Sequence, residues 1–195
     1  MKKTKIGALI IVIVAFSCGS FAEAFEGRLY KDDVYGFEIT FPKGWMELTS
    51  PARGEKSVTF AKYDVKFPQK KTPLINVTVF AIPNPDIKTP SDLGRYLIGT
   101  WKKQEPSIQI IEGPKEVEVN HLSGIRIVSE SQLREKGRRE KAMLGTYSYY
   151  FINDGKIIEI AAFDDKSDLD LHLDMIEQSI HSFQLIAPGE TSKTE

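Results

Sequence analysis

Residues 35–45 read Tyr-Gly-Phe-Glu-Ile-Thr-Phe-Pro-Lys-Gly-Trp, and this stretch decides the type of fold. Its apolar side chains at Phe37, Ile39 and Phe41 alternate with polar ones, which is the period-two pattern of a strand with one buried face. Pro42-Lys43-Gly44 then predicts a tight turn, because proline and glycine both favour turn conformations. The stretch therefore indicates a strand, a turn and the start of a second strand.

The same alternation recurs downstream, between clusters of turn residues. We expect further strands at residues 56–63, 74–82, 108–111, 115–119, 125–133, 142–152 and 156–163, with a short final strand at 183–186. Asn153-Asp154-Gly155 is a strong hairpin signal, since Asp-Gly tolerates the positive φ angles of a tight turn. Residues 25–31, ahead of the first strand, we interpret as a leader into the domain.

Two segments have helical spacing instead. Thr89 is a suitable N-cap and Pro90 a suitable first residue for a helix that extends to Lys103. Ser167 is the expected cap of a second helix, whose apolar positions fall three to four residues apart: Leu169, Leu173, Ile176, Ile180 and Phe183. These elements predict an α+β fold, an antiparallel sheet of about six to seven strands with a mid-chain helix and a C-terminal helix packed on it.

The chain begins with the pattern of an export signal. Lys2, Lys3 and Lys5 are followed by an uncharged apolar run at residues 6–16. Ala22-Glu23-Ala24 supplies the small residues at which a signal peptidase cleaves. We therefore predict a signal peptide at residues 1–24, a single domain at residues 25–187 and a flexible tail at residues 188–195.

Cys18 leaves an alternative open within this signal. A bacterial lipoprotein signal also ends in small residues before a cysteine, and that cysteine becomes lipidated. Ala15 and Phe16 match the pattern poorly, since leucine and a small residue are usual at those positions. Cleavage after Ala24 predicts a released periplasmic protein, whereas lipidation of Cys18 predicts an envelope protein anchored to the membrane.

Composition excludes several classes of function. The formal net charge is −1, and removal of the signal, with three lysines and one glutamate, leaves about −3. Nucleic acid is not an expected partner, because phosphate recognition requires clustered basic residues. Cys18 is the single cysteine, so the mature domain cannot form an internal disulfide or use a cysteine nucleophile. We expect a monomer whose stability comes from its core.

Element order and the motif Tyr35-Gly36-Phe37 with Phe41-Pro42-x-Gly44-Trp45 resemble the PsbP-like superfamily, over roughly residues 30–186. That superfamily includes the extrinsic photosystem II protein PsbP and the bacterial envelope protein DcrB. The resemblance implies a PsbP-like α/β sandwich and a non-enzymatic domain that binds other proteins. It implies fold far more than activity, since its members differ in function.

No catalytic motif is present, and we predict neither an enzyme nor a bound cofactor. The sequence has no Gly-x-Ser-x-Gly, no His-Glu-x-x-His and no glycine-rich phosphate loop. His172 lies four residues after Asp168 and could share a helix face with it. We predict no metal site there, because acidic residues at a helix N-terminus favour the helix dipole without a metal.

The candidate residues for partner binding are Arg134, Arg138, Arg139 and Tyr150. The three arginines lie around Gly137, in a turn that could contact an acidic protein or an anionic membrane surface. The simpler interpretation, which we favour, is a solvated turn, since Glu135 and Glu140 dilute the positive charge. In the strand at residues 142–152, alternation places Tyr150 on the face opposite Tyr147 and Tyr149.

These observations favour an exported, non-enzymatic envelope protein that acts as an accessory or adaptor subunit for a protein partner. The alternative is a periplasmic small-ligand-binding module, with a pocket between sheet and helix near Trp45, Trp101 and Tyr147. Ligand binding to the native state would raise its apparent stability, which would distinguish the second class from the first.

Overall fold

The computed structural model describes residues 26–48, 56–62, 73–133 and 142–186, which form ten strands and two helices. The predicted signal peptide, Cys18 and the predicted tail lie outside the described residues. Arg134, Arg138 and Arg139 lie outside them as well. None of the helices in the described ranges is both long and apolar enough to cross a membrane.

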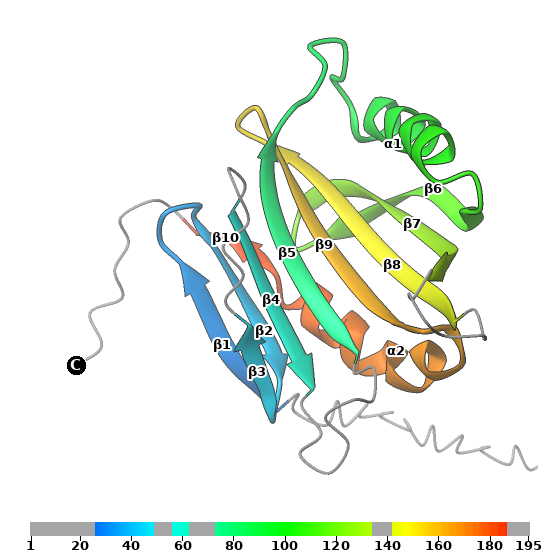
Figure 1. Cartoon of the computed structure of the whole chain (residues 1–195). Helices are drawn as coiled ribbons and strands as arrows, with labels where there is room; N and C mark the ends of the chain where they lie inside the picture. The colour runs from blue at the N-terminus through cyan, green and yellow to red at the C-terminus, as the bar shows by residue number, and fades with distance from the viewer. Residues whose placement is uncertain (1–25, 49–55, 63–72, 134–141, 187–195) are drawn as a thin grey trace, which may run out of the picture.

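A seven-stranded sheet is the centre of the fold, and all of its neighbouring strands are antiparallel. Figure 1 shows its strongly twisted strands. In spatial order the strands are β3 (Trp45–Leu48), β4 (Lys56–Lys62), β5 (Leu74–Ala81), β9 (Lys156–Asp165), β8 (Ala142–Asn153), β7 (Leu122–Leu133) and β6 (Gln109–Val119). The sheet confirms the predicted fold class and strand number.

Two tight turns connect the long strands, and the one at Asp154 and Gly155 is the hairpin turn that the sequence predicts. Asp154 and Gly155 have φ angles of 47° and 70°, and they join β8 to β9. Asn120 and His121, with φ of 46° and 67°, join β6 to β7. The segments predicted as two strands at 108–111 and 115–119 form one strand, β6, whose register against β7 shifts near Pro114.

A second sheet of three strands was not expected from the sequence. It contains β1 (Gly27–Asp32), β2 (Phe37–Pro42) and the short β10 (Gln184–Leu185), with β2 in the middle. The interpretation of residues 25–31 as a leader is therefore wrong for the strand residues. The segment lacks apolar alternation because only Tyr30 and Asp32 of β1 turn toward the core, and Leu29 stays exposed.

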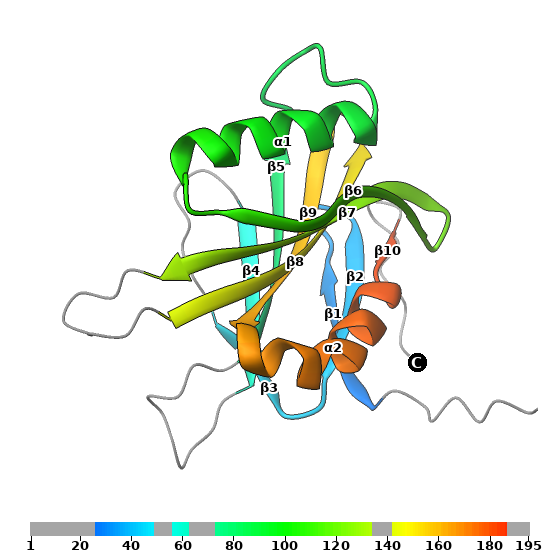
Figure 2. The same ribbon diagram turned by 90° about the vertical axis from the view of Figure 1, so that its right-hand side faces the viewer.

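The two helices lie on opposite faces of the large sheet, as Figure 2 shows. Helix α1 (Pro90–Gln104) begins at Thr89, whose hydroxyl accepts a hydrogen bond from the Asp92 N–H in a capping box. Helix α2 (Lys166–His181) begins two residues earlier than predicted. Its N-cap is Asp165, whose carboxylate accepts a hydrogen bond from the Ser167 N–H, so Ser167 lies inside the helix.

Two hydrophobic clusters fill the two sides of the sheet. The larger lies between the large sheet, the small sheet and α2, and it is rich in aromatic rings. Its rings include Phe41 and Phe60, stacked with centroids 3.3 Å apart. The smaller cluster lies under α1 and joins Leu93 and Leu97 to Ile125, Ile127 and Ile157 of the sheet. Only part of this second face is therefore apolar.

Candidate functional site

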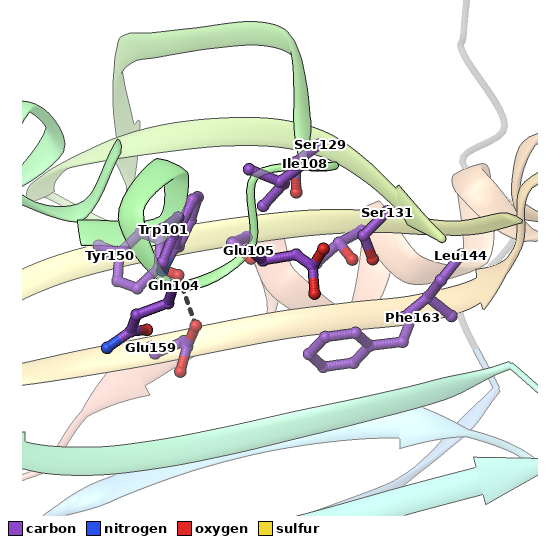
Figure 3. Close-up of a pocket in the computed structure, with 12 residues that line it drawn as sticks. Trp101, Gln104, Glu105, Ile108, Ser129, Ser131, Leu144, Tyr150, Glu159 and Phe163 are labelled. Atoms are coloured by element: carbon purple, nitrogen blue, oxygen red, sulfur yellow. Dashed lines mark hydrogen bonds between the residues drawn. The ribbon is translucent and has the colours of Figure 1, made fainter. Parts of the chain in front are cut away.

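A pocket of about 300 Å³ opens on the α1 face of the large sheet, beside the C-terminal end of α1. Figure 3 shows its lining side chains around this opening. Four come from the end of α1 and the loop after it, and eight come from three neighbouring strands. They are Trp101, Gln104, Glu105, Ile108, Ser129, Ser131, Leu144, Thr146, Ser148, Tyr150, Glu159 and Phe163. The pocket thus lies where the helix stops covering the sheet.

Small hydroxyl side chains form the part of the sheet beneath the pocket. Ser129 of β7 is paired with Thr146 of β8, and Ser148 stands two residues further along β8 on the same face. Ser129 and Ser148 are buried, at 5% and 2% exposure. Their small side chains leave the space that larger residues would fill, and their hydroxyl groups make that space polar.

Tyr150 and Glu159 form a buried hydrogen-bonded pair at one end of the pocket. The Tyr150 hydroxyl donates to the Glu159 carboxylate over 2.5 Å, across the paired strands β8 and β9. Burial, followed by the Glu159 charge, raises the pKa of the Tyr150 hydroxyl well above its ordinary value. Tyr150 therefore remains a neutral donor, and it fixes the Glu159 carboxylate at the edge of the pocket.

The end of α1 supplies the opposite wall. The Trp101 ring lies 6.2 Å from the Tyr150 ring, measured between centroids, in a tilted arrangement. Glu105 is the C-cap residue of α1, and its backbone N–H donates to the Trp101 carbonyl. The Glu105 carboxylate accepts a hydrogen bond from the Ser107 hydroxyl, which orients it. An aromatic ring and a carboxylate therefore lie together where the helix ends.

The polar character of this face continues beyond the pocket. Asn76 of β5 accepts hydrogen bonds from the hydroxyls of Ser57 and Thr59 on β4, over 2.5 and 2.9 Å. Its amide group donates to the Thr78 hydroxyl over 2.7 Å. Thr78 is in turn paired with Glu159 in the sheet register. Polar side chains on the α1 face thus extend from β4 to β7.

A carboxylate–imidazole pair lies on the other side of the sheet. The side chain of Asp164 is fully buried and lies 2.8 Å from Nδ1 of His172. Burial raises the pKa of the Asp164 carboxyl, and the hydrogen bond with His172 opposes that rise. His172 of α2 thus contacts Asp164 of β9, a residue outside its own helix. Among the described residues, no three metal-ligating side chains converge on one point.

The structure corrects the location of one predicted contact residue. Tyr150 is 1% exposed and packs under α1, so its ring cannot form a partner-binding surface. The face assignment from alternation is correct, because Tyr147 and Tyr149 pack in the cluster on the α2 side. The face opposite that cluster is covered by α1 at Tyr150, which alternation within a single strand cannot show.

Of the three aromatic residues predicted to lie near a pocket, only Trp101 lines it. Trp45 and Tyr147 pack in the aromatic cluster on the α2 side. The sequence analysis also missed Glu105 and Glu159. A signal existed for Glu159, since it is a charged residue in the otherwise apolar run Ile157–Ala162, at a position facing away from Ile158 and Ile160.

Comparisons with known proteins support the fold. No protein-family model matches the chain, and no curated protein matches it. Solved structures do match: cyanobacterial PsbP from Synechocystis has a TM-score of 0.53 at 16% identity, covering 87% of this chain and 97% of that one. The protein therefore has the PsbP-like fold, as the sequence resemblance implied.

Two further structures share this arrangement. LpqN of Mycobacterium tuberculosis, described as involved in cell envelope biogenesis, has a TM-score of 0.53 at 12% identity, over 85% of this chain and 88% of that one. PA94 of Pseudomonas aeruginosa, a protein of unknown function, has a TM-score of 0.52 at 11% identity, over 80% of this chain and 94% of that one. At these identities the likeness concerns fold alone.

Proposed function

We propose that this protein is an exported, non-enzymatic domain of the bacterial envelope that binds a small organic molecule in the pocket beside α1. The pocket carries the proposal. Its volume of about 300 Å³ is at the lower end of the roughly 300–1,000 Å³ typical of ligand sites. Its mixed lining of aromatic rings, hydroxyls and carboxylates is also typical of such sites.

Export rests on the signal-like residues 1–24, with release after Ala24 or anchoring through Cys18 as the two modes. The description of LpqN as an envelope protein is compatible with this location. We propose a monomer without a cofactor.

The absence of catalysis is proposed from the position of the titratable groups. The buried Asp164–His172 pair and the pocket carboxylates Glu105 and Glu159 lie on opposite faces of the large sheet. None of the pocket residues that the structure describes is a histidine, cysteine or lysine. An acid–base mechanism needs partnered groups within hydrogen-bond reach of one substrate, which this separation disfavours.

A thermal-shift screen of small molecules tests ligand binding. A molecule that binds the native state alone stabilises it by about 2.7 kcal/mol when present at a hundredfold excess over Kd. Ser131→Trp should fill the pocket and abolish the shift. Ser123→Trp places the same ring at an exposed position of the same strand and should leave the shift unchanged. If the ligand still raises the melting temperature of Ser131→Trp, the ligand binds at a site other than this pocket.

An adaptor role is the second candidate, and exposed apolar residues on two sheet edges favour it. Leu29 of β1 is 57% exposed, and Met46 and Leu48 of β3 are 44% and 43% exposed. Both strands are at the edge of their sheet, where unpaired backbone groups can accept another chain. Arg134, Arg138 and Arg139, between the paired strands β7 and β8, stay predicted contacts of the same role.

Crosslinking in native cells, followed by purification through a C-terminal tag, tests the adaptor role. One envelope protein recovered in near-equal amount would support it. Arg138→Glu combined with Arg139→Glu should weaken that recovery, while Lys115→Glu with Glu116→Lys, on exposed β6, should not. Recovery with anionic vesicles but no protein would favour a membrane surface as the partner.

A further inference from the structure

Hydroxyl side chains around the pocket indicate the chemistry of its ligand. Building on the proposed ligand-binding function, we propose that the pocket binds a neutral sugar, a single ring that carries several hydroxyl groups. The pocket carboxylates do not carry this proposal, because Glu105 and Glu159 already accept hydrogen bonds from Ser107 and Tyr150. It rests instead on three hydroxyl side chains, on their spacing and on the aromatic rings beside them.

Three hydroxyl groups of the lining have no hydrogen-bond partner within the part of the chain that the structure describes. They belong to Ser129, Ser131 and Thr146. Ser129 is the most informative of them, because it is only 5% exposed and borders the pocket. Buried polar groups in folded proteins nearly always have a partner, since leaving one unpaired costs free energy. A ligand in the pocket would supply the partner that the described chain does not.

Other hydroxyl groups on the same face of the sheet are satisfied within the protein. On β4 and β5, the Asn76 amide joins three hydroxyl side chains in one hydrogen-bonded group outside the pocket. Ser148 lines the pocket, but its hydroxyl interacts with Tyr150. Among the described residues of this face, the hydroxyls without a partner are therefore the ones that surround the pocket.

The spacing of these hydroxyls favours a ligand with several hydroxyl groups. Ser129 lies directly opposite Thr146 in the sheet register, and Ser131 is two residues further along β7 on the same face. Opposed side chains have Cβ atoms about 5 Å apart, and side chains two residues apart along a strand are about 7 Å apart. A ligand hydroxyl can donate and accept at once, whereas an ammonium group only donates and a carboxylate only accepts. A sugar ring presents such hydroxyls in several directions.

Aromatic rings supply the remaining contact that a sugar needs. Trp101 lines the pocket from α1 and Phe163 lines it from β9. One face of a sugar ring carries mainly C–H groups, which pack against the electron-rich face of an aromatic ring. The pocket therefore offers hydrogen bonds to the edge of a sugar and apolar contact to its face. Its volume of about 300 Å³, at the small end for ligand sites, favours one sugar unit.

Four neutral sugars and one ring without their hydroxyl groups test the proposal. The sugars are D-glucose, D-galactose, D-mannose and N-acetyl-D-glucosamine, and the control is tetrahydropyran-2-methanol, which has the same six-membered ring with a single hydroxyl. Affinities for the purified protein are measured by isothermal titration calorimetry. At least one sugar should bind about tenfold or more tightly than the control ring, because each added hydrogen bond contributes a few-fold.

Variants locate the binding site of that sugar. Ser129→Ala removes one hydroxyl and should weaken sugar binding about fivefold while leaving the control ring unchanged. Ser129→Ala combined with Thr146→Val removes two hydroxyls at nearly constant shape, and it should bring the sugar close to the affinity of the control ring. Ser123→Ala, at an exposed position of the same strand, should change neither affinity. Urea unfolding of each variant checks that the fold is retained.

The outcomes separate the two proposals. If no sugar binds more tightly than tetrahydropyran-2-methanol, the sugar assignment is overturned, and the ligand-binding function stands when the wider screen yields a different pocket ligand. If that screen also yields no pocket ligand, both proposals fail. Sugar binding that is equally tight in Ser129→Ala and in the double variant would overturn the assignment as well, because the sugar would then bind at another site.

Discussion

The two faces of the large sheet differ in what covers them. On the α2 face, the small sheet and α2 enclose a continuous aromatic cluster that includes Phe37, Phe41 and Phe60. On the other face, α1 covers an aliphatic cluster at one end and leaves hydroxyl and carboxylate side chains around a pocket. The comparison predicts that the α2 face supplies most of the stability, and it leaves the α1 face for the ligand binding that we propose.

The register of the strands explains how one sheet carries both faces. Along β8, the side chains of Tyr147, Tyr149 and Phe151 point to the α2 face of the sheet. Those of Ser148 and Tyr150 point to the α1 face, where the pocket lies. A shift of one residue would exchange the two sets and bury the hydroxyl side chains among aromatic rings. The division of roles is therefore fixed by pairing within the sheet.

Truncation of an aromatic side chain should show the largest difference in stability between the two faces of the sheet. Phe41→Ala removes a fully buried ring stacked on Phe60, and we expect a loss of about 3–5 kcal/mol in the free energy of unfolding. Phe163→Ala, on the partly open pocket face, should cost about 1–2 kcal/mol. Urea unfolding measures both. Equal losses would contradict the assignment of stability to the α2 face.

A methyl group at Gly94 should disturb the packing of α1 against β6 and β7. A Cβ there would lie 2.6 Å from the Pro114 Cβ and 3.0 Å from the Ile125 Cδ1, so the helix must shift. We expect Gly94→Ala to lower the free energy of unfolding by about 1–3 kcal/mol.

Gly99 provides a matched control on the same helix. A Cβ at Gly99 meets no atom within 4 Å, so Gly99→Ala should stabilise the protein by up to about 1 kcal/mol through helix propensity. Thermal unfolding of the two variants side by side distinguishes packing from propensity. Destabilisation by Gly99→Ala of the same size would mean that α1 tolerates no change at all.

Thr89→Ala should have a smaller effect on the same helix. The Thr89 hydroxyl accepts the Asp92 N–H, and its loss leaves that donor to water. We expect the free energy of unfolding to fall by about 1 kcal/mol. Thr89→Ser retains the hydroxyl and should recover most of the loss. Hydrogen exchange of the α1 amides would show whether the first turn opens more often.

The smallest expected effect is a pH dependence at Asp164. Because burial raises the pKa of Asp164 in the folded state, folding favours the protonated carboxyl. This contribution is complete below the ordinary pKa of aspartate, about 3.9, and is lost as pH rises through the folded pKa. Wild-type protein should therefore gain stability relative to Asp164→Asn as pH falls from 7 to 4.

Urea unfolding of wild type and Asp164→Asn at several pH values measures that difference, which cancels the titration of other groups. If wild type instead loses stability relative to Asp164→Asn as pH falls, the hydrogen bonds from His172 and the Asp165 N–H lower the pKa of Asp164 by more than burial raises it. His172→Gln would then identify which of the two is responsible.

The sequence predicts the fold well because its strongest elements carry their own local signals. Alternation and the Asp154-Gly155 turn predict β8 and β9, and the Thr89 cap with Pro90 predicts α1. β1 escapes prediction because most of its side chains remain exposed, so it lacks apolar alternation, although it pairs with β2, the next strand along the chain. Edge strands owe their conformation to pairing more than to pattern.

The pocket could be predicted only in part. Trp101 and the face of Tyr150 follow from periodicity, but the pocket exists because α1 ends above β8 and β9. Glu105 and Glu159 are 54 residues apart in sequence, so no spacing rule links them. Their proximity follows from the three-dimensional placement of a helix end on a sheet, which sequence patterns do not encode.

The small sheet has a consequence for the order in which the chain can fold. β2 pairs on one side with β1 and on the other with β10, and the Ser182 hydroxyl accepts from the Thr40 N–H, 142 residues earlier. The first strands to be synthesised therefore lack one neighbour until nearly the whole domain is available. If the chain is exported from its N-terminus, as we propose, this sheet can be completed only after residue 185 has crossed, and the domain would then finish folding outside the export channel.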